Sequence, residues 1–440
     1  MLIMSNSITI SAEEKIYFHI GHNIIQELIT YLSEKNVHHI ILVTDENEYK
    51  ALGARVEKAL RRANFDIKNV VLQGKEICAD ERSIVQALLA SDDVEQLYIA
   101  IGSGTVTDIV RFVSHRTRSY FISLPTAPSV DGFASNVAAM YIMDYKQSLI
   151  SRSPCTIFAD LDTLCKAPRP LIAAGFGDMF GKFSALADWK LAHILLEDRY
   201  DANIAQRSKQ ARDNVVAQAK RLEKDWENSI RSLMKALYEE GLCMLNFGNS
   251  RPASGSEHLF SHYWEMKLLR ENRPAILHGS KVGLASIYIA RIYEMIRKTS
   301  KIEAIEKLNN TPKFDPDEEI QKIISGYGEK VSGQIIKIQH EHLQRTEEEY
   351  RSLKEKIVDN WETIQDIAAE VPPEAEIISL LKSISGATQP EEIGLNNADV
   401  RDAFDYAQYV RGMFTVLNLI QMLGLKLEPM IQLPIKQQII

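Results

Sequence analysis

The stretch QLYIAIGSGTVTDIVRFVSHR, Gln96 to Arg116, indicates the fold class of this chain. The run from Gln96 to Gly102 predicts a strand, and the residues from Gly104 onward have the spacing of a helix. Glycines in the turn let the backbone approach a ligand, and the start of such a helix favours a phosphate group. The spacing is not the full G-x-G-x-x-G pattern, so a tight turn without a ligand remains the alternative.

The alternation of strand and helix continues on both sides of this turn. Strands are expected over 38–44, 67–73 and 120–125, and helices over 51–63 and 82–90. Strands separated by helices of this length imply parallel βαβ units with right-handed crossovers. We therefore expect a Rossmann-like parallel sheet whose ligands bind at the carboxyl ends of the strands.

The pattern changes after residue 125. A loop of small and polar residues is followed by a predicted hairpin and further strand over 138–162, and from about residue 168 the pattern is almost wholly helical. We therefore predict an α/β nucleotide-binding domain over 1–166 and an all-α domain for metal and substrate over 167–440. Residues 301–367 are highly charged and suggest a solvated pair of surface helices, with a partner-binding segment as the alternative.

The composition excludes several classes of protein. The 440 residues are 45% hydrophobic and 25% charged, with a net charge of −8, so nothing suggests wrapping of nucleic acid. No apolar run approaches the about 20 residues of a membrane span, and the N-terminus lacks the pattern of a signal peptide. Four scattered cysteines without a C-x-x-C pair suggest reduced thiols. We expect a cytoplasmic protein that contacts neither membrane nor nucleic acid.

Polar residues at predicted strand ends are candidates for cofactor binding. Asp45 ends the strand over 38–44, where a carboxylate can accept hydrogen bonds from a ribose 2′-OH. Capping of the next helix is the competing role for Asp45. Thr126, Ala127, Pro128 and Ser129 follow the strand over 120–125 and form a third candidate loop.

Two histidines in SRPASGSEHLFSHYWEM, residues 250–266, raise the question of a metal. His258 and His262 are four residues apart, so they should share one helix face, as two ligands, as a ligand and its neighbour, or as ordinary residues. His278 is expected at a helix start, and so is Asp178, where a capping role is the more common one. Asp178, His258 and His278 together offer one oxygen and two nitrogens, as in a catalytic divalent site.

Two further features bear on this site. A zinc protease is disfavoured, because the glutamate of H-E-x-x-H is absent and Glu257 instead precedes the first histidine. Lys182 is one helical turn from Asp178, where it could pair with that carboxylate or direct its charge into the same cavity.

Several stretches occur together in the order of one known family. They are GSGTVTDIVRFVS, SLPTAPSVDGFAS, FADLDTL, AAGFGDMFGKFSALADW, SRPASGSEHLFSHYWEM and RPAILHGSKVG, within residues 41–283, with a weaker match over 396–424. The chain resembles the sn-glycerol-1-phosphate dehydrogenases, in particular the bacterial arabinose-operon type, of the iron-type alcohol dehydrogenase and dehydroquinate synthase superfamily. The resemblance implies a dehydroquinate synthase-like fold, a homodimer, NAD(H) or NADP(H), and nickel or zinc.

The resemblance also assigns residues by motif position. To the cofactor it assigns Asp45, Gly104, Thr105, Val106, Thr107, Asp108, Thr126, Ala127, Pro128, Ser129 and Ser135. To the metal it assigns Asp178, His258 and His278. To the substrate it assigns Asp131, Asp178 and His262, with His262 and Asp131 in the catalytic roles. Two features depart from the family: Arg111 replaces a common lysine, and the charged region over 301–367 matches poorly.

The implied reaction is reduction of dihydroxyacetone phosphate to sn-glycerol 1-phosphate, and its reverse. Lys182 and Arg251 are the cations we predict for the phosphate. The alternatives are a glycerol or other polyol dehydrogenase, a lyase similar to dehydroquinate synthase, and a binding protein without activity. The carboxylate of Asp45 favours NADH, since it would repel a 2′-phosphate.

Overall fold

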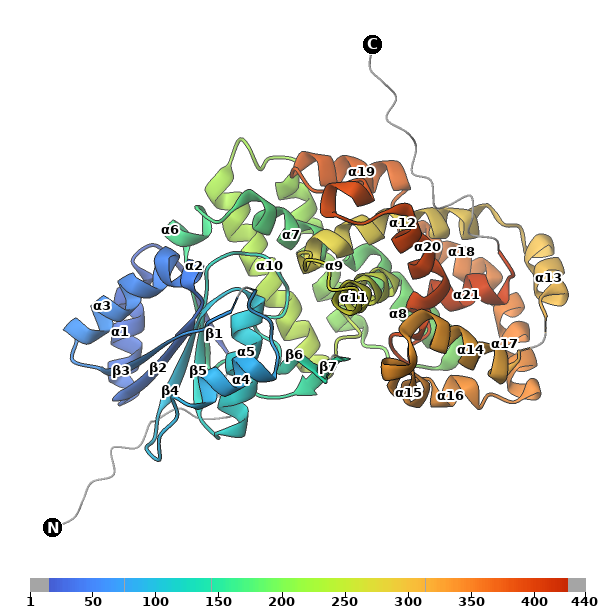
Figure 1. Ribbon diagram of the computed structural model, residues 1–440. Helices are drawn as coiled ribbons and strands as arrows, with labels where there is room; N and C mark the ends of the chain where they lie inside the picture. Colours follow the sequence, from blue (N-terminus) through green and yellow to red (C-terminus); the bar gives the residue numbers. More distant parts are fainter. Residues whose placement is uncertain (1–15, 75, 144, 313, 426–440) are drawn as a thin grey trace. The chain divides into compact units, whose positions relative to one another are not determined.

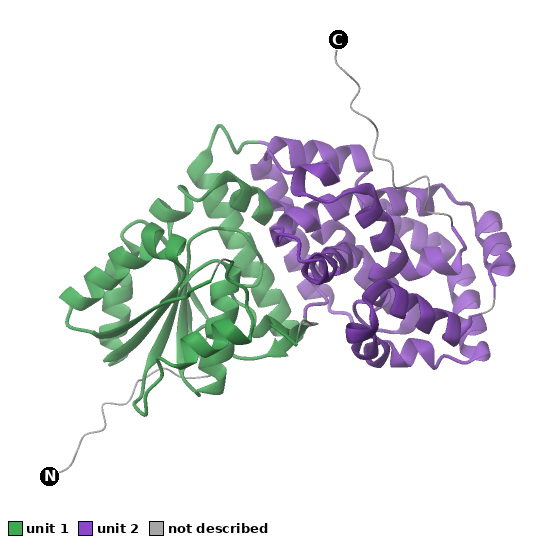
Figure 2. Ribbon diagram, in the orientation of Figure 1, with its two compact units in different colours: residues 1–175, 221–249 green, residues 176–220, 250–440 purple. Residues whose placement is uncertain are grey.

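The computed structural model describes residues 16–74, 76–143, 145–312 and 314–425 (Figure 1). Most of the N-terminal stretch that argued against a signal peptide lies outside these residues. Contacts divide the chain into two compact units, each built from two segments: residues 1–175 and 221–249 form unit 1, and residues 176–220 and 250–440 form unit 2 (Figure 2). This division does not test the predicted domain boundary at residue 166, which stays a prediction.

Unit 1 contains a six-stranded parallel sheet. Its strands are β1 (Tyr17–Gly21), β2 (His39–Thr44), β3 (Asp66–Val71), β4 (Leu97–Gly102), β5 (Tyr120–Pro125) and β8 (Thr156–Asp160), in the order β1-β8-β5-β4-β2-β3. The predicted Rossmann-like sheet is thus confirmed. The predicted hairpin is also present, as the antiparallel pair β6 (Val137–Ile142) and β7 (Tyr145–Ile150).

Helices cover both faces of this sheet (Figure 1). Because side chains alternate along a strand, Ile40 and Leu42 of β2 pack with helices α1 (Ile24–Glu34) and α3 (Ala54–Arg62). Ile41 and Val43 point the other way and pack with α4 (Glu81–Leu88) and α5 (Gly104–Arg116). Strands buried on both faces have continuous apolar sequences, which explains the run in β2 and β4.

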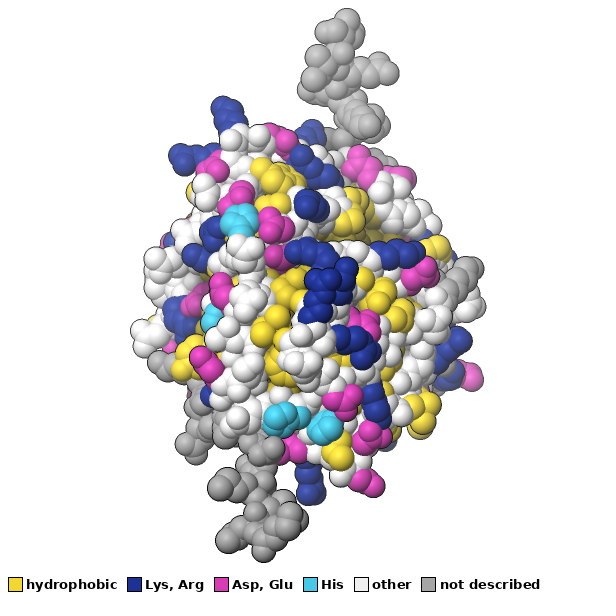
Figure 3. Space-filling view, turned by 90° about the vertical axis from the view of Figure 1, so that its left-hand side faces the viewer, with side chains coloured by type: hydrophobic (Ala, Val, Ile, Leu, Met, Phe, Trp, Pro, Cys, Tyr) yellow, Lys and Arg dark blue, Asp and Glu magenta, His cyan; other side chains and the backbone are white. Residues whose placement is uncertain are grey.

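The helix α3 shows how sequence spacing separates core from solvent. Val56 and Leu60, four residues apart, are fully buried against the sheet. Its other side carries exposed Lys and Arg side chains, and Figure 3 shows Lys and Arg gathered on that side of the molecule. A short helix α2 (Glu46–Glu48) and a π-helical turn η1 (Tyr49–Gly53) precede α3, so the predicted helix over 51–63 begins earlier than expected.

A helix from much later in the chain completes unit 1. This is α10 (Trp226–Phe247), whose Tyr238 ring stacks on Phe18 with 4.4 Å between the ring centroids. The Tyr238 hydroxyl donates to the carbonyl oxygen of Ile16 over 2.8 Å. At the other end, Trp226 Nε1 donates to the carbonyl oxygen of Cys165, which follows helix α6 (Leu161–Leu164), over 3.0 Å. Residues 221–249 are therefore an integral part of the α/β unit.

After β8 the described residues form helices and loops and no further strand, in agreement with the predicted helical region. Besides α6 and α10, the helices are α7 (Arg169–Phe180), which begins in unit 1, α8 (Lys182–Leu196), α9 (Ala202–Ala219), α11 (Ser256–Arg270), α12 (His278–Lys298), α13 (Lys301–Asn310), α14 (Pro316–Tyr327), α15 (Glu329–Ile338), α16 (His340–Leu343), α17 (Glu347–Asp359), α18 (Trp361–Ala369), α19 (Glu374–Ser383), η2 (Pro390–Ile393), α20 (Asn397–Tyr406), η3 (Ala407–Tyr409) and α21 (Val416–Met422). Among the described residues, none of the helices has the length and apolar content needed to cross a bilayer.

The charged region over 301–367 differs from the prediction. It forms the helices α13 to α18 rather than a solvated pair, and their inner faces are buried. Ile323, Ile357 and Trp361 are fully buried, and Trp361 Nε1 donates to the carbonyl oxygen of Thr299 over 3.1 Å. The apolar residues spaced among the many charges of this region form these buried faces, and the charge content alone does not reveal them.

Candidate metal centre

Asp178 lies in the last turn of α7, so its predicted place at a helix start is wrong. The glycines around it do not end the helix; they let other chain segments come close. A Cβ atom on Gly177 would lie 2.4 Å from the carbonyl oxygen of Gly279, which is incompatible with any side chain. Gly279 follows His278, the first residue of α12, as predicted. The close approach at Gly177 therefore brings Asp178 next to His278.

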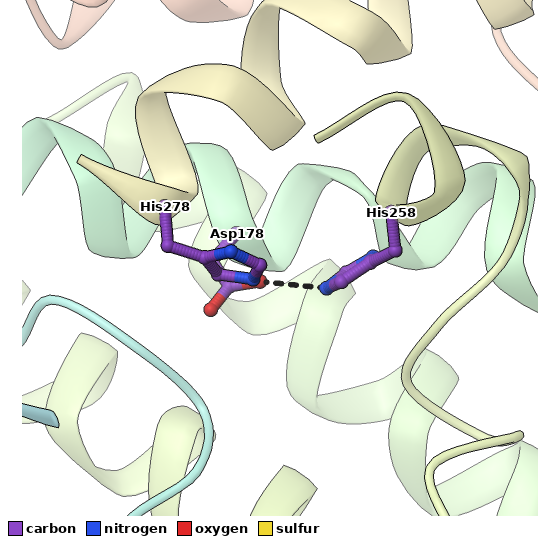
Figure 4. A group of neighbouring side chains, drawn as sticks. All are labelled: Asp178, His258 and His278. Carbon is purple, nitrogen blue, oxygen red and sulfur yellow. Dashed lines mark ion pairs between the residues drawn. The ribbon is translucent and has the colours of Figure 1, made fainter. Parts of the chain in front are cut away.

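The three predicted metal ligands come together from three helices of unit 2. One ligand atom each of Asp178, His258 and His278 lies within 4.8 Å of the other two (Figure 4). The His258 Nε2 atom is 3.4 Å from Asp178 Oδ1. Asp178 and His258 are buried, and His278 is partly exposed. One carboxylate oxygen and two imidazole nitrogens around one point fit a divalent transition metal.

A second layer of polar groups orients the histidines. His258 Nδ1 lies 2.6 Å from Glu257 Oε1, and this carboxylate also accepts from the Ser184 hydroxyl and from the Gly255 N–H. A carboxylate only accepts, so Nδ1 of His258 carries a proton, and Nε2, which faces Asp178, is the ring nitrogen that would bind a metal. Metal-binding histidines are usually oriented by such a carboxylate. This role of Glu257 was not predicted; in the sequence, Glu257 served only as evidence against a zinc protease.

The carboxyl group of Asp178 is held in its ionised form, which suits a ligand of a cation. Burial acts to raise the pKa of this carboxyl, but Lys182, the hydrogen bond with His258 and the charges of the two histidines hold the pKa well below its usual range. Lys182 Nζ is 3.3 Å from Asp178 Oδ1, donates to the carbonyl oxygen of Ala253 over 2.9 Å and is fully buried. Of the two roles considered for Lys182, the structure therefore shows the pairing with Asp178.

A second group of potential ligands shares His278. It consists of His262, Glu265 and His278, whose candidate atoms also lie within 4.8 Å of one another. Here, however, Arg411 Nη2 lies 3.0 Å from His262 Nε2, and Lys281 Nζ lies 3.4 Å from Glu265 Oε2. One imidazole nitrogen is therefore occupied by a cationic donor. We favour the group with Asp178, because His258 has an orienting carboxylate and its Nε2 faces the site.

His258 and His262 share one face of α11, as their spacing predicts, with 6.1 Å between ring centroids. The start of α11 is fixed by the buried carboxylate of Asp188 in α8. This carboxylate accepts from the Ser256 N–H and hydroxyl, from the Tyr293 hydroxyl and from the Val416 N–H, all within 2.6–2.7 Å. Segments far apart in the sequence thereby hold the helix that carries both histidines.

The predicted cofactor residues lie in unit 1, at the carboxyl ends of β2, β4 and β5. The strands β2 and β4 are neighbours, and the helices that follow them cover opposite faces of the sheet. This is a topological switch point, the usual ligand site of such a sheet. The first turn of α5 contains Gly104, Thr105, Val106, Thr107 and Asp108, and the loop after β5 contains Thr126, Ala127, Pro128, Ser129, Asp131 and Ser135.

Two carboxylates at the switch point, those of Asp45 and Glu48, accept hydrogen bonds from backbone N–H groups. Asp45 caps α2 by accepting from the Glu48 N–H over 2.7 Å, so its capping role is present and its ribose role stays a prediction. Glu48 reaches across to β4, where Oε1 accepts from the Ser103 N–H over 2.6 Å. A Cβ on Gly102 would lie 2.1 Å from Glu48 Oε2, so a side chain there would displace the Glu48 carboxylate from this position. Burial and the charge of Asp45 raise the pKa of Glu48 to about 7.

Arg111, the departure from the family pattern, has a structural role. Its buried guanidinium pairs with Asp108 and donates to the carbonyl oxygens of Gly132, Phe133 and Val137, over 2.7, 3.0 and 3.2 Å respectively. Asp108 also accepts from the Ala139 N–H. Arg111 thus joins α5 to the loop that contains Asp131 and Ser135.

Comparison with known proteins agrees with this fold and cluster. The family model for iron-containing alcohol dehydrogenases matches residues 19–168, and this is the class that the parallel sheet and helical region define. The chain is 32% identical over 402 residues to a glycerol-1-phosphate dehydrogenase [NAD(P)+] of Geobacillus thermodenitrificans, covering 90% of each chain. It is 33% identical over 405 residues to that of Bacillus subtilis, covering 91% of this chain and 90% of the relative. The chain belongs to the family of these glycerol-1-phosphate dehydrogenases, and the resemblance in the sequence is confirmed.

Solved structures extend the agreement in fold to 92% of this chain. A probable glycerol dehydrogenase from Sinorhizobium meliloti aligns with a TM-score of 0.59 and 15% identity over 92% of this chain and 95% of that one. A 1,3-propanediol oxidoreductase aligns with a TM-score of 0.59 and 14% identity over 92% of this chain and 96% of that one. The predicted architecture, a parallel sheet followed by an all-helical region, is therefore that of these enzymes.

Proposed function

We propose that this protein reduces dihydroxyacetone phosphate to sn-glycerol 1-phosphate with NADH or NADPH, and catalyses the reverse reaction. The main support is the convergence of Asp178, His258 and His278 in a chain that matches glycerol-1-phosphate dehydrogenases over nine-tenths of its length. Three protein ligands leave positions open for a substrate oxygen, as catalytic metal sites require.

In the proposed reaction, the metal cation, the cofactor and the side chains of the protein have separate roles. A divalent ion, nickel or zinc, held by Asp178, His258 and His278 would polarise the ketone and stabilise negative charge on its oxygen during hydride transfer. The cofactor supplies the hydride. The carboxyl ends of the strands, with Asp45 and the first turn of α5, bind this cofactor. His262, one helical turn from His258, transfers the proton to the new alcohol oxygen, and Asp131 binds a substrate hydroxyl.

We also propose that the protein works in the cytoplasm as a homodimer. No disulfide joins the cysteines, which are Cys78, Cys155, Cys165 and Cys243, and this fits a reducing cytoplasm. A homodimer is proposed by analogy with the bacterial type that the sequence resembles.

The test is an NADH-oxidation assay with dihydroxyacetone phosphate and a panel of divalent metals, with chiral analysis of the product. We expect metal-dependent NADH consumption and sn-glycerol 1-phosphate as the product. Equal or faster use of unphosphorylated dihydroxyacetone would instead indicate a polyol dehydrogenase. Turnover of substrate without net NADH consumption would indicate a lyase, and absence of both turnover and bound metal would indicate a binding protein.

A further inference from the structure

A phosphate dianion on the substrate requires cationic or hydrogen-bond donors near the metal centre. The two cations that the sequence suggested are used elsewhere. Lys182 is fully buried against Asp178, and buried Arg251 donates to the carbonyl oxygens of Asp188 and Phe414 over 3.1 and 2.8 Å. Lys281 is also buried, 3.4 Å from the carboxylate of Glu265. The phosphate must therefore be bound by another group.

Arg411 differs from these cations in exposure and in partners. Its side chain is partly exposed, and Nη1 donates to the hydroxyls of Ser250 and Ser254 over 2.7 and 3.3 Å. Its Nη2 lies 3.0 Å from His262 Nε2. Serine hydroxyls can rotate to donate to an anion, and a guanidinium presents its donors in a fork that matches phosphate oxygens. One cation and two hydroxyls are thus already assembled.

The position of this group relative to the metal ligands is suitable. Arg411 contacts His262, whose ring centroid is 5.6 Å from that of His278 and 6.1 Å from that of His258. The guanidinium thus contacts a ring that neighbours both histidines of the predicted metal site. A three-carbon phosphate ester is short, so a ketone at the metal and a phosphate at Arg411 can belong to one molecule.

We propose that Arg411, Ser250 and Ser254 form the subsite for the phosphate group of the substrate. This inference rests on the proposed function, because it assigns the part of the site that distinguishes a phosphorylated ketone from a free one. A guanidinium only donates, so His262 Nε2 accepts from it. A phosphate that takes over these donors also leaves Nε2 free to take up a proton from solvent and pass it to the oxygen of the reacting carbonyl.

The test compares two substrates in three variants. Arg411→Gln removes the charge, the double variant Ser250→Ala/Ser254→Ala removes the hydroxyls, and Arg401→Gln removes an exposed arginine in α20 as the matched control. For Arg411→Gln we expect kcat/KM for dihydroxyacetone phosphate to fall about 10- to 100-fold, the range for lost hydrogen bonds to a charged group. The fall in kcat/KM for unphosphorylated dihydroxyacetone, which reports any disturbance of His262, should be clearly smaller than the fall for the phosphate ester, with unchanged metal content. The double serine variant should show a smaller loss in the same direction, and the control none.

A second measurement separates this inference from the proposed function. Binding of inorganic phosphate is followed by calorimetry in the wild type and in Arg411→Gln, whether or not the protein reduces dihydroxyacetone phosphate. Loss of phosphate binding in the variant supports the subsite even if the substrate is different. Equal phosphate binding, or equal losses with both ketones, would overturn the subsite.

Discussion

Both ring nitrogens of His258 face a carboxylate: Nδ1 contacts Glu257, and Nε2 contacts Asp178. Because the tautomer is set by Glu257, the affinity of the site for a metal depends on a residue that does not touch the metal. Outer carboxylates of this kind contribute about 10- to 100-fold to metal affinity.

We therefore predict that Glu257→Gln weakens metal binding by about 10- to 100-fold, measured by competition with a chromophoric chelator. The matched control is Glu265→Gln, which removes the carboxylate near His262 and leaves His258 untouched. If Glu265→Gln weakens binding and Glu257→Gln does not, the ion is bound by the second group of ligands, and our assignment is wrong.

Glu48 gives a prediction about pH. Burial and the nearby charge of Asp45 raise its pKa from 4.5 to about 7 in the folded protein. A raised carboxyl pKa stabilises the fold fully below the pKa of the unfolded chain, and this contribution is lost as the pH rises through the folded value. Relative to Glu48→Gln, the wild type should thus lose about 3 kcal/mol between pH 4.5 and 7.

Urea unfolding of both proteins at a series of pH values tests this prediction. Glu46→Gln, which removes an exposed carboxylate two residues away, should follow the wild type above pH 5 or so. A constant difference between wild type and Glu48→Gln across the range would show that Glu48 does not titrate as its burial requires.

The sequence identifies candidate residues of the site but not the distant residues that contact them. The three metal-ligand candidates could be named because their motifs are local. Arg411 is 149 residues from His262, and no spacing in the sequence connects them. The place of Asp178 was wrong because the glycines around it indicated a helix start, whereas Gly177 serves the approach of Gly279 from a distant helix.

Among the elements, α5 and the loop after β5 depend on one buried cation. Arg111 satisfies three carbonyl oxygens of that loop and the carboxylate of Asp108. Burial of Asp108 already raises its pKa to about 6, despite the opposing charge of Arg111. Removal of the guanidinium would leave a buried carboxylate without this partner.

We predict that Arg111→Met lowers the free energy of unfolding by about 3–5 kcal/mol, the cost of breaking a buried pair from one side. The double variant Arg111→Met/Asp108→Asn should recover part of the loss, because it also removes the stranded charge. Denaturant unfolding measures both effects. An Arg111→Met protein as stable as the wild type would mean that the loop does not depend on this residue.

Elements with strong local patterns were predicted closely. The strand β5 and the helix α5 have the bounds expected from their sequences, because apolar spacing and the glycine turn define both. The helices α13 to α18 were not resolved as separate elements. Their packing depends on buried residues such as Trp361, whose partner Thr299 lies outside the charged region.

On the scale of the whole molecule, unit 1 is assembled from two separate segments of chain. Its second segment contains α10, which packs on β1 through Tyr238 and on the end of α6 through Trp226. A fragment ending at residue 175 contains the whole sheet but exposes the surface that α10 covers.

We predict that residues 1–175 alone form a loosely packed or aggregating fragment. The same fragment joined by a flexible linker to residues 221–249 should unfold cooperatively, as seen by circular dichroism during heating. A control with Tyr238→Ala and Trp226→Ala in the joined fragment should lose much of the cooperativity that residues 221–249 add. Cooperative unfolding of the short fragment by itself would show that α10 is dispensable.

The return of α10 also affects how the protein is made. A ribosome that has finished the last strand of the sheet must translate through residue 249 before unit 1 can be completed. At about 5–20 residues per second, the nascent sheet waits for several seconds with an apolar surface uncovered. During synthesis this interval is when the growing chain most needs a chaperone.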